Sequence, residues 1–224
     1  MGSQRFAGKT MYNLAGKPAL QHLLDSVTQI FAKRDIFVAT SVDPANDIIE
    51  AFAGKYGVHV YRGSENNVAE RFLDIVVKEI PDFFIRLNAD SPLLDYRILA
   101  TALAKMETAS DDIVTTVIDR TFPSGMNVEI LKNKTFVESY PHFNAAAHFE
   151  HVTKYFYENR NGFRIESLPC PVTNPHNFKF TFDTTEDKKR LEAFFSALPR
   201  PHYIYNLEEK CGIYKNLFGV SENA

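Results

Sequence analysis

The sequence contains no tryptophan and only two cysteines, Cys170 and Cys211. Their spacing fits neither a disulfide framework nor a zinc site and is typical of thiols in a reducing compartment. No apolar stretch approaches the length of a membrane span, and the N-terminus lacks the apolar core of a signal peptide. We therefore expect a cytoplasmic protein without a membrane contact.

Basic residues are not in excess either: the sequence has 25 lysines and arginines and 28 acidic residues, which gives a formal net charge of −3. Without a basic run, the sequence lacks the electrostatic footprint of a nucleic-acid surface. What it does contain is 45% hydrophobic residues, with 19 Phe and 10 Tyr, in 224 residues. This composition is sufficient for one core, and we expect residues 1–224 to form a single domain.

Apolar runs and helical stripes alternate along the chain. The patterns predict strands over 36–39, 58–61, 83–87, 113–117, 128–131 and 178–182, and helices over 18–31, 48–56, 68–80, 96–106, 149–158 and from 185 onward. Alternation with short connections predicts an α/β fold with a mostly parallel sheet and helices on both faces. Ligands of such sheets bind beyond the carboxyl ends of the strands.

The N-terminal residues 2–9 (GSQRFAGK) combine backbone freedom, a hydroxyl and two cations. These groups suit a triphosphate, whose oxygens need converging amides and positive charge. A frayed basic tail is an equally good interpretation of this segment taken alone. A P-loop is not, because Ser3 stands where that motif needs glycine and no strand precedes it.

Two aspartates, Asp90 and Asp183, each follow a predicted strand. Parallel strands would bring both carboxylates to one rim, where they could hold Mg²⁺ together with phosphate oxygens. The alternative is local: Asp90 would cap the helix that follows it, and Asp183 would be the N-cap of the next helix. The sequence pattern alone favours these local roles.

Six segments, in order, resemble the cytidylyltransferases of the spore-coat polysaccharide type, which are related to the enzymes that make CMP-Kdo and CMP-sialic acid. The segments are residues 1–9 (MGSQRFAGK) with 14–18 (LAGKP), 60–64 (VYRGS) with 68–72 (VAERF), 86–95 (RLNADSPLLD), 123–129 (PSGMNVE), 150–153 (EHVT) and 182–187 (FDTTED). Agreement of many modest signals over most of the chain makes the resemblance specific.

The resemblance implies a Rossmann-like nucleotide-diphospho-sugar transferase fold. It also implies transfer of CMP from CTP to a sugar, by expectation a sugar acid, with release of pyrophosphate, for surface polysaccharide or glycan biosynthesis. Mg²⁺ is the implied cofactor. By the same analogy we expect a homodimer, with residues 121–157 as the segment that contacts the partner chain.

The resemblance also assigns residues to roles. The implied catalytic residues are Lys9, Arg5 and Asp90, and the implied metal ligands are Asp90 and Asp183. The implied nucleotide-binding residues are Gly2, Ser3, Arg5, Lys9, Arg62, Gly63, Ser64, Arg71 and Ala89. The implied sugar-binding residues are Gly125, Asn127, Glu129, Glu150 and His151. The alternatives to these binding roles are a surface ion pair for Arg71 and a packing or partner-chain role for His151.

Two features depart from the family pattern. Asn127 stands where the family usually has aspartate, which removes a charge and adds donors. The apolar strand that normally precedes the phosphate loop is also missing, because the sequence starts inside the loop. Either the true start lies upstream, or the protein is a degenerate paralogue that binds nucleotide weakly or not at all.

Two rival functions therefore accompany the cytidylyltransferase hypothesis. The first is a non-catalytic relative that only binds nucleotide or serves as a scaffold. The second is a glycosyltransferase of the related fold, a class that typically carries an Asp-x-Asp motif. Here the corresponding residues are Asn88-Ala89-Asp90, with asparagine first.

Overall fold

The structure is a computed structural model that describes residues 8–181 and 183–219. Its strands are β1 (Asn13–Leu14), β2 (Lys17–Pro18), β3 (Phe37–Ser41), β4 (His59–Gly63), β5 (Phe83–Arg86), β6 (Ile113–Thr115), β7 (Glu129–Lys132) and β8 (Ile165–Ser167). Its α-helices are α1 (Ala19–Val27), α2 (Asp47–Tyr56), α3 (Val68–Glu79), α4 (Tyr96–Thr108), α5 (Asn133–Ser139), α6 (Ala146–His151), α7 (Lys154–Glu158), α8 (Thr185–Ser196) and α9 (Leu207–Phe218). None of these helices is both long enough and apolar enough to cross a bilayer.

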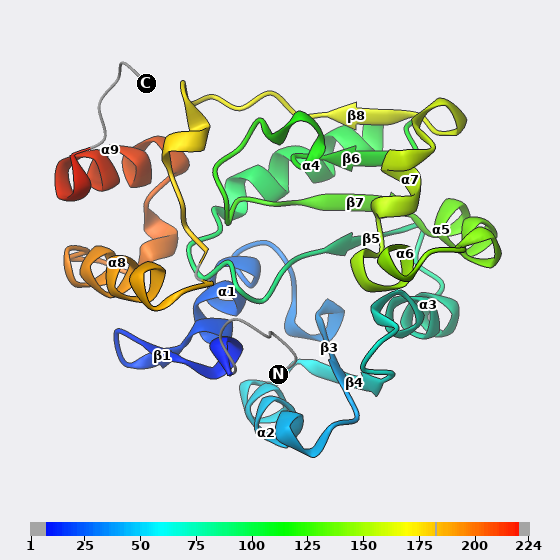
Figure 1. Ribbon diagram of the computed structural model, residues 1–224, viewed down its shortest axis with the longest axis horizontal. Coiled ribbons are helices and arrows are strands. Elements are labelled where there is room, and N and C mark those ends of the chain that lie inside the picture. The colour runs from blue at the N-terminus through cyan, green and yellow to red at the C-terminus, as the bar shows by residue number, and fades with distance from the viewer. Residues whose placement is uncertain (1–7, 182, 220–224) are drawn as a thin grey trace.

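The strands form two separate sheets and a small hairpin (Figure 1). β3 and β4 pair in parallel, while the larger sheet has the order β5-β7-β6-β8. β7 runs antiparallel to both of its neighbours, and only β6 and β8 pair in parallel in that sheet. The α/β class is therefore confirmed, but the expected mostly parallel sheet is in fact mixed. Among the described residues, no strand pairs β3 with β5.

Helices cover both faces of the larger sheet, as predicted. Alternate residues of each strand point to opposite faces, so Val114 and Ile130 join one core while Ile113 and Leu131 join the other. The first core is closed by α1, α4, α8 and α9, and the second by α3, α5 and α7 (Figure 1). A third cluster lies between α1, α2 and the small parallel sheet.

Local sequence signals set several helix boundaries. Pro18 precedes α1 with an extended backbone, Gly57 ends α2 in the left-handed conformation at φ 92°, and the Asn67 side chain caps α3. The predicted helix over 149–158 is instead two helices, α6 and α7. The break is at Val152, which has φ 55° and ψ −54° although a β-branched residue rarely adopts positive φ.

The predicted strand over 178–182 is also different. Phe178 and Phe180 do alternate into the core, at 2% and 0% exposure, but this segment forms only an isolated bridge between Lys179 and Ser124. Residue 182 lies outside the described residues. The alternation of apolar and polar residues correctly predicted which side chains are buried, because that pattern needs only an extended backbone. A strand also needs hydrogen bonds to a neighbouring strand, and these are not set by the alternation.

One core position violates the usual burial rules. Lys210 of α9 is fully buried, and its ammonium nitrogen has no hydrogen-bond partner among the described residues. Burial lowers the pKa of Lys210 to about 8, with Asp95 acting in the opposite direction. A cation without a partner in the core costs folding free energy, since desolvation is not repaid.

We expect Lys210→Met to raise the free energy of unfolding at pH 7 by about 1–3 kcal/mol, because methionine fills a similar volume without a charge. The native pKa of about 8 lies below the ordinary value of 10.5. Wild-type stability should therefore rise between pH 8 and pH 10.5, and the advantage of methionine should shrink there. Urea unfolding at pH 7 and pH 9.5 measures both effects. Exposed Lys189 of α8 gives the control Lys189→Met, and a Lys210→Met protein no more stable than wild type at pH 7 contradicts the prediction.

Candidate active site

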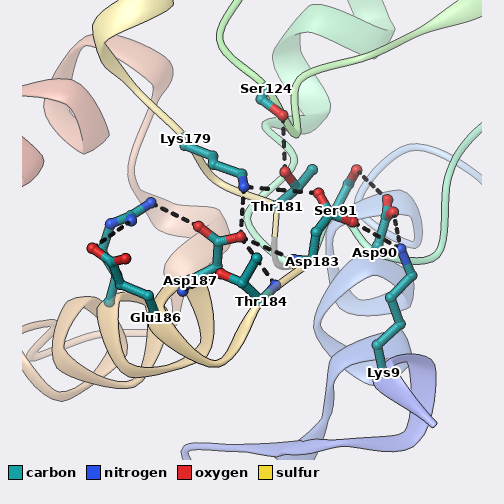
Figure 2. Close-up of polar contacts among 11 residues, drawn as sticks. Lys9, Asp90, Ser91, Ser124, Lys179, Thr181, Asp183, Thr184, Glu186 and Asp187 are labelled. Atoms are coloured by element: carbon teal, nitrogen blue, oxygen red, sulfur yellow. Dashed lines mark hydrogen bonds and ion pairs between the residues drawn. The ribbon is translucent and has the colours of Figure 1, made fainter. Parts of the chain in front are cut away.

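Three residues from distant segments meet at the predicted phosphate-binding end of the molecule. The Lys9 ammonium nitrogen lies 2.6 Å from Asp90 Oδ2 and 3.2 Å from Asp183 Oδ1 (Figure 2). The side chains are partly shielded, with exposures of 19% for Lys9, 21% for Asp90 and 35% for Asp183. Asp90 is 81 positions and Asp183 is 174 positions from Lys9 in the sequence, yet the three charged side chains form a single cluster.

Lys9 begins the short 3₁₀ helix Lys9–Met11, directly after Gly8. Gly8 has φ 78°, a conformation that glycine adopts without strain and that turns the chain toward the two aspartates. Burial alone would lower the pKa of Lys9, but the two carboxylates, Asp90 foremost, outweigh it, and the pKa is raised. Lys9 therefore stays protonated at neutral pH, and its positive charge is paired with the two carboxylates.

Asp90 lies in the loop between β5 and α4. The loop is fixed from below, because Ser91, Leu94 and Asp95 are buried and the Ser26 hydroxyl of α1 donates to the Leu94 carbonyl at 2.8 Å. Asp95, not Asp90, caps α4, since its Oδ1 accepts from the Arg97 amide. The alternative capping role for Asp90 is thereby removed, and its carboxylate faces Lys9.

Asp183 likewise does not serve as a helix cap. The N-cap of α8 is Thr184, whose hydroxyl accepts from the Asp187 amide in a capping box. The buried Asp187 carboxylate in turn accepts from the Asp183 and Thr184 amides at 3.1 and 3.2 Å and from Lys179 (Figure 2). Burial would raise the pKa of Asp187, but its hydrogen bonds, Lys179 first, lower it. A charged, buried carboxylate thus fixes the backbone that carries Asp183.

The segment before Asp183 is held by residues 124 and 125. The Phe180 amide donates to the Ser124 carbonyl at 2.7 Å, and the Ser124 and Thr181 hydroxyls are 2.8 Å apart (Figure 2). Gly125 has φ 96°, and a Cβ there would lie 2.7 Å from the Phe180 carbonyl carbon. Gly125 was predicted to bind sugar; here its lack of a side chain is what lets the Asp183 segment approach.

Comparison with known proteins identifies the family. The family model described as "Cytidylyltransferase" matches residues 1–216. The chain belongs to the cytidylyltransferase family. As a member it is a CTP-dependent nucleotidyltransferase, and the predicted resemblance is confirmed.

Individual relatives of this cytidylyltransferase include the spore coat polysaccharide biosynthesis protein SpsF of Bacillus subtilis (strain 168), 30% identical over 87% of this chain and 82% of the relative. The 3-deoxy-manno-octulosonate cytidylyltransferase of Escherichia coli is 29% identical over 47% of this chain and 42% of its own length. The solved structure of a cytidylyltransferase from Leptospira borgpetersenii superposes with a TM-score of 0.91 at 25% identity, covering 100% of this chain and 94% of that one. A CMP:2-keto-3-deoxy-manno-octonic acid synthetase structure shares the fold, with a TM-score of 0.63 at 17% identity and coverage of 87% and 94%.

Some of the predicted nucleotide-binding residues are described by the structure and others are not. Gly2, Ser3 and Arg5 lie outside the described residues. Arg62 at the end of β4 is turned toward α2, where it pairs with Asp47 and Glu50 at 2.6 Å each and donates to the Ser41 and Asp43 carbonyls. Ser64 accepts from the Asn67 amide, and Ala89 packs against the third cluster. Their roles in this cytidylyltransferase stay predictions.

Arg71 of α3 does not form the surface ion pair that was its alternative. Its Nη1 donates to the Ala39 carbonyl at 3.3 Å, and its buried Nε has no partner among the described residues. Burial lowers the pKa of Arg71, with no described carboxylate in ion-pair contact. Its stem crosses Gly63, where a Cβ would lie 2.8 Å from Arg71 Cγ. An incompletely paired guanidinium at the carboxyl ends of β3 and β4 is suited to an anion.

The other predicted sugar-binding residues differ in exposure. Glu150 and His151 are exposed at the end of α6, and Asn127 is half-buried before β7. Glu129, by contrast, is 1% exposed, with both carboxylate oxygens occupied by Arg86 and Tyr157. Sequence reasoning assigned no role to Arg86, although it stands in the 86–95 motif, and missed Tyr157, which no local pattern distinguishes.

We expect Gly125→Ala to displace the Asp183 segment, because the new Cβ meets backbone atoms of Phe180 and must adopt positive φ. The free energy of unfolding should fall by about 2–4 kcal/mol. Pyrophosphate release should fall by about ten- to a hundredfold at temperatures where the variant is folded, since small displacements of catalytic groups are costly.

Gly212→Ala on α9 is the matched control, because a Cβ at Gly212 meets nothing within 4 Å. Alanine there should leave turnover unchanged and stability equal or higher. Thermal unfolding and steady-state turnover check both variants. Full activity in a stable Gly125→Ala protein would show that Asp183 does not depend on this contact.

Proposed function

We propose that this enzyme transfers CMP from CTP to an acidic sugar and releases pyrophosphate, for the biosynthesis of a surface polysaccharide or glycan. The observation that carries the proposal is the meeting of Asp90 and Asp183 around the Lys9 ammonium. Two carboxylates suit a magnesium ion and the lysine beside them suits phosphate oxygens, and a triphosphate binds through both. Family membership supports CTP as the nucleotide.

In the proposed reaction, a sugar hydroxyl oxygen attacks the α-phosphorus of CTP in line. A phosphorus–oxygen bond to the sugar forms, the bond between the α-phosphorus and the bridging oxygen breaks, and pyrophosphate leaves. The hydroxyl proton passes to solvent, because no described residue stands out as a dedicated base. Catalysis then consists of positioning and charge neutralisation, in which Lys9 and Arg5 bind phosphate oxygens.

The residues present fit Mg²⁺. Asp90 and Asp183 already converge on one cationic atom, the Lys9 nitrogen, and oxygen donors are what Mg²⁺ takes. Among the described residues there is no cluster of three or more His, Cys, Asp or Glu, so the two carboxylates leave coordination positions for phosphate and water. Bound there, Mg²⁺ would neutralise charge on the triphosphate.

The acidic acceptor is supported by relatives whose names specify 3-deoxy-manno-octulosonate and 8-amino-3,8-dideoxy-manno-octulosonate. Both are sugar acids. The polysaccharide context is supported by the spore coat relative. The homodimer formed through residues 121–157 and the cytoplasmic location also stay as proposals.

The direct experiment incubates the protein with CTP, Mg²⁺ and a panel of sugar acids and measures pyrophosphate. The panel contains 3-deoxy-manno-octulosonate, its 8-amino-3,8-dideoxy analogue and N-acetylneuraminate, with UTP, GTP and ATP as alternative nucleotides. We expect acceptor-dependent release with CTP. Release of a nucleoside diphosphate from a nucleotide-sugar, or no release with any pair, would contradict the proposal.

Asp90→Asn tests the metal role, because it keeps the side-chain shape and removes the charge. We expect turnover to fall by at least about a hundredfold, since losing charge neutralisation costs several kcal/mol in such reactions, while thermal unfolding shows an intact fold. Asp35→Asn is the control, because Asp35 is an exposed carboxylate in a 3.8 Å ion pair. Unchanged turnover of Asp90→Asn over a Mg²⁺ titration would rule out this role.

A further inference from the structure

A row of polar side chains crosses three strands of the larger sheet. Register pairs Arg86 of β5 with Glu129 of β7, and Glu129 with Thr115 of β6. Paired residues of neighbouring strands point to the same face. Arg86, Glu129 and Thr115 therefore share one face of the sheet. Two residues away along each strand, the same face carries the apolar row Phe84, Leu131 and Ile113.

This row is located at the functional edge of the sheet. Arg86 and Thr115 are the last residues of β5 and β6, and Asp90 follows Arg86 by one short loop. Leu131 and Ile113 belong to the core covered by α3, α5 and α7, so the row marks where that core ends and the carboxyl-end rim begins. The rim is where α/β sheets bind ligands.

Glu129 is too deeply buried to contact a ligand. It is 1% exposed, Arg86 Nη1 donates to its Oε2, and the Tyr157 hydroxyl donates to its Oε1 at 2.6 Å. Burial and the neighbouring Glu129 charge raise the pKa of Tyr157, so its proton remains in place as a donor. The Thr115 hydroxyl lies 3.0 Å from the Tyr157 oxygen and completes the set.

Arg86, in contrast, keeps unused donors. Its side chain is 17% exposed, and Glu129 is its sole hydrogen-bond partner among the described residues. A single terminal nitrogen makes that contact, so the rest of the planar guanidinium, which carries five N–H groups in total, remains for a second partner. A carboxylate or a phosphate oxygen matches this fork.

We infer that Arg86 binds the carboxylate of the acceptor sugar, with Glu129 and Tyr157 as positioning residues that hold its guanidinium. This inference rests on the proposed function and names the group that selects an acidic acceptor. Glu129 then acts on the sugar through Arg86 and not by direct contact.

The geometry favours the acceptor over the triphosphate as the anion. The short helix that begins with Lys9 contacts α1, and Asp183 lies just before α8. Both α1 and α8 pack against the opposite face of the sheet (Figure 1). The Arg86 row faces α3 and α7 instead, and the end of α6, just before α7, carries the exposed Glu150 and His151. Arg86 is thus on the side of Glu150 and His151, two of the predicted sugar-binding residues.

The test compares each variant with the most active acid of the panel and with the carboxamide of the same sugar. We expect wild type to prefer the acid by about a hundredfold in kcat/KM. Arg86→Gln should reduce that preference to below fivefold, with the KM for CTP changed less than twofold. Tyr157→Phe should raise the KM for the acid about five- to twentyfold at nearly constant kcat, and millimolar guanidinium should partly restore Arg86→Ala.

Arg164→Gln is the matched control, because Arg164 also faces a carboxylate, Asp112 at 3.7 Å, but stands at the opposite end of the sheet, just before β8. An Arg86→Gln enzyme that still prefers the acid a hundredfold overturns the inference, as does a rise in the KM for CTP alone, which would assign Arg86 to the triphosphate. If the wild-type enzyme uses neutral sugars and no sugar acid, the role of Arg86 is overturned, while the proposed transfer of CMP still holds. No pyrophosphate from any pair overturns the proposed function and this inference together.

Discussion

The arrangement of the site depends on one electrostatic constraint: two carboxylates from distant segments approach each other, and a cation must lie between them. Asp90 and Asp183 would repel in a partly shielded location, because like charges are poorly screened away from bulk water. Lys9 supplies the compensating charge, and its pKa is raised although its burial acts in the opposite direction. The N-terminal segment, the loop after β5 and the start of α8 are therefore held to one another by charge as well as by packing.

Each carboxylate is fixed by structure that contributes nothing to the chemistry itself. The Asp90 loop rests on buried residues and on a hydrogen bond from α1, whereas Asp183 depends on the Asp187 carboxylate and on the approach of residues 178–181 to Gly125. Asp187 is effective because it is buried and accepts several donors, which keeps it charged. Charge-assisted hydrogen bonds to backbone amides define a position more sharply than apolar contact does.

The sequence predicted what local pattern determines. Helices α1 to α4 and the strands between them follow from apolar periodicity and from stop signals such as Gly57, whereas the pairing of Asp90 with Asp183 was implied by the family resemblance and not by local pattern. What the sequence did not reveal depends on partners distant along the chain. The antiparallel direction of β7, the missing ladder beside Phe180 and the break at Val152 are decided by tertiary packing. The Thr153 amide donates to the His151 carbonyl across Val152, a turn that is rare for a β-branched residue, and Val152 itself is fully buried.

Glu129 shows the same limit at the level of function. The family resemblance assigned Asn127 and Glu129 to sugar binding, which implies a direct contact. Burial opposes a direct contact for Glu129, since a carboxylate at 1% exposure with two donors is a fixed acceptor and cannot rearrange for a substrate without leaving an unpaired buried charge. The adaptable group is the neighbouring Arg86, which is partly exposed and incompletely paired. In the proposed function the two faces of the sheet would have separate roles. The side packed against α1 and α8 would supply the carboxylates and the cation for the triphosphate, and the side packed against α3 and α7 would present the Arg86 guanidinium to the acceptor. Because both sides end at the same rim, the attacking and the leaving groups could be oriented independently, as an in-line displacement requires.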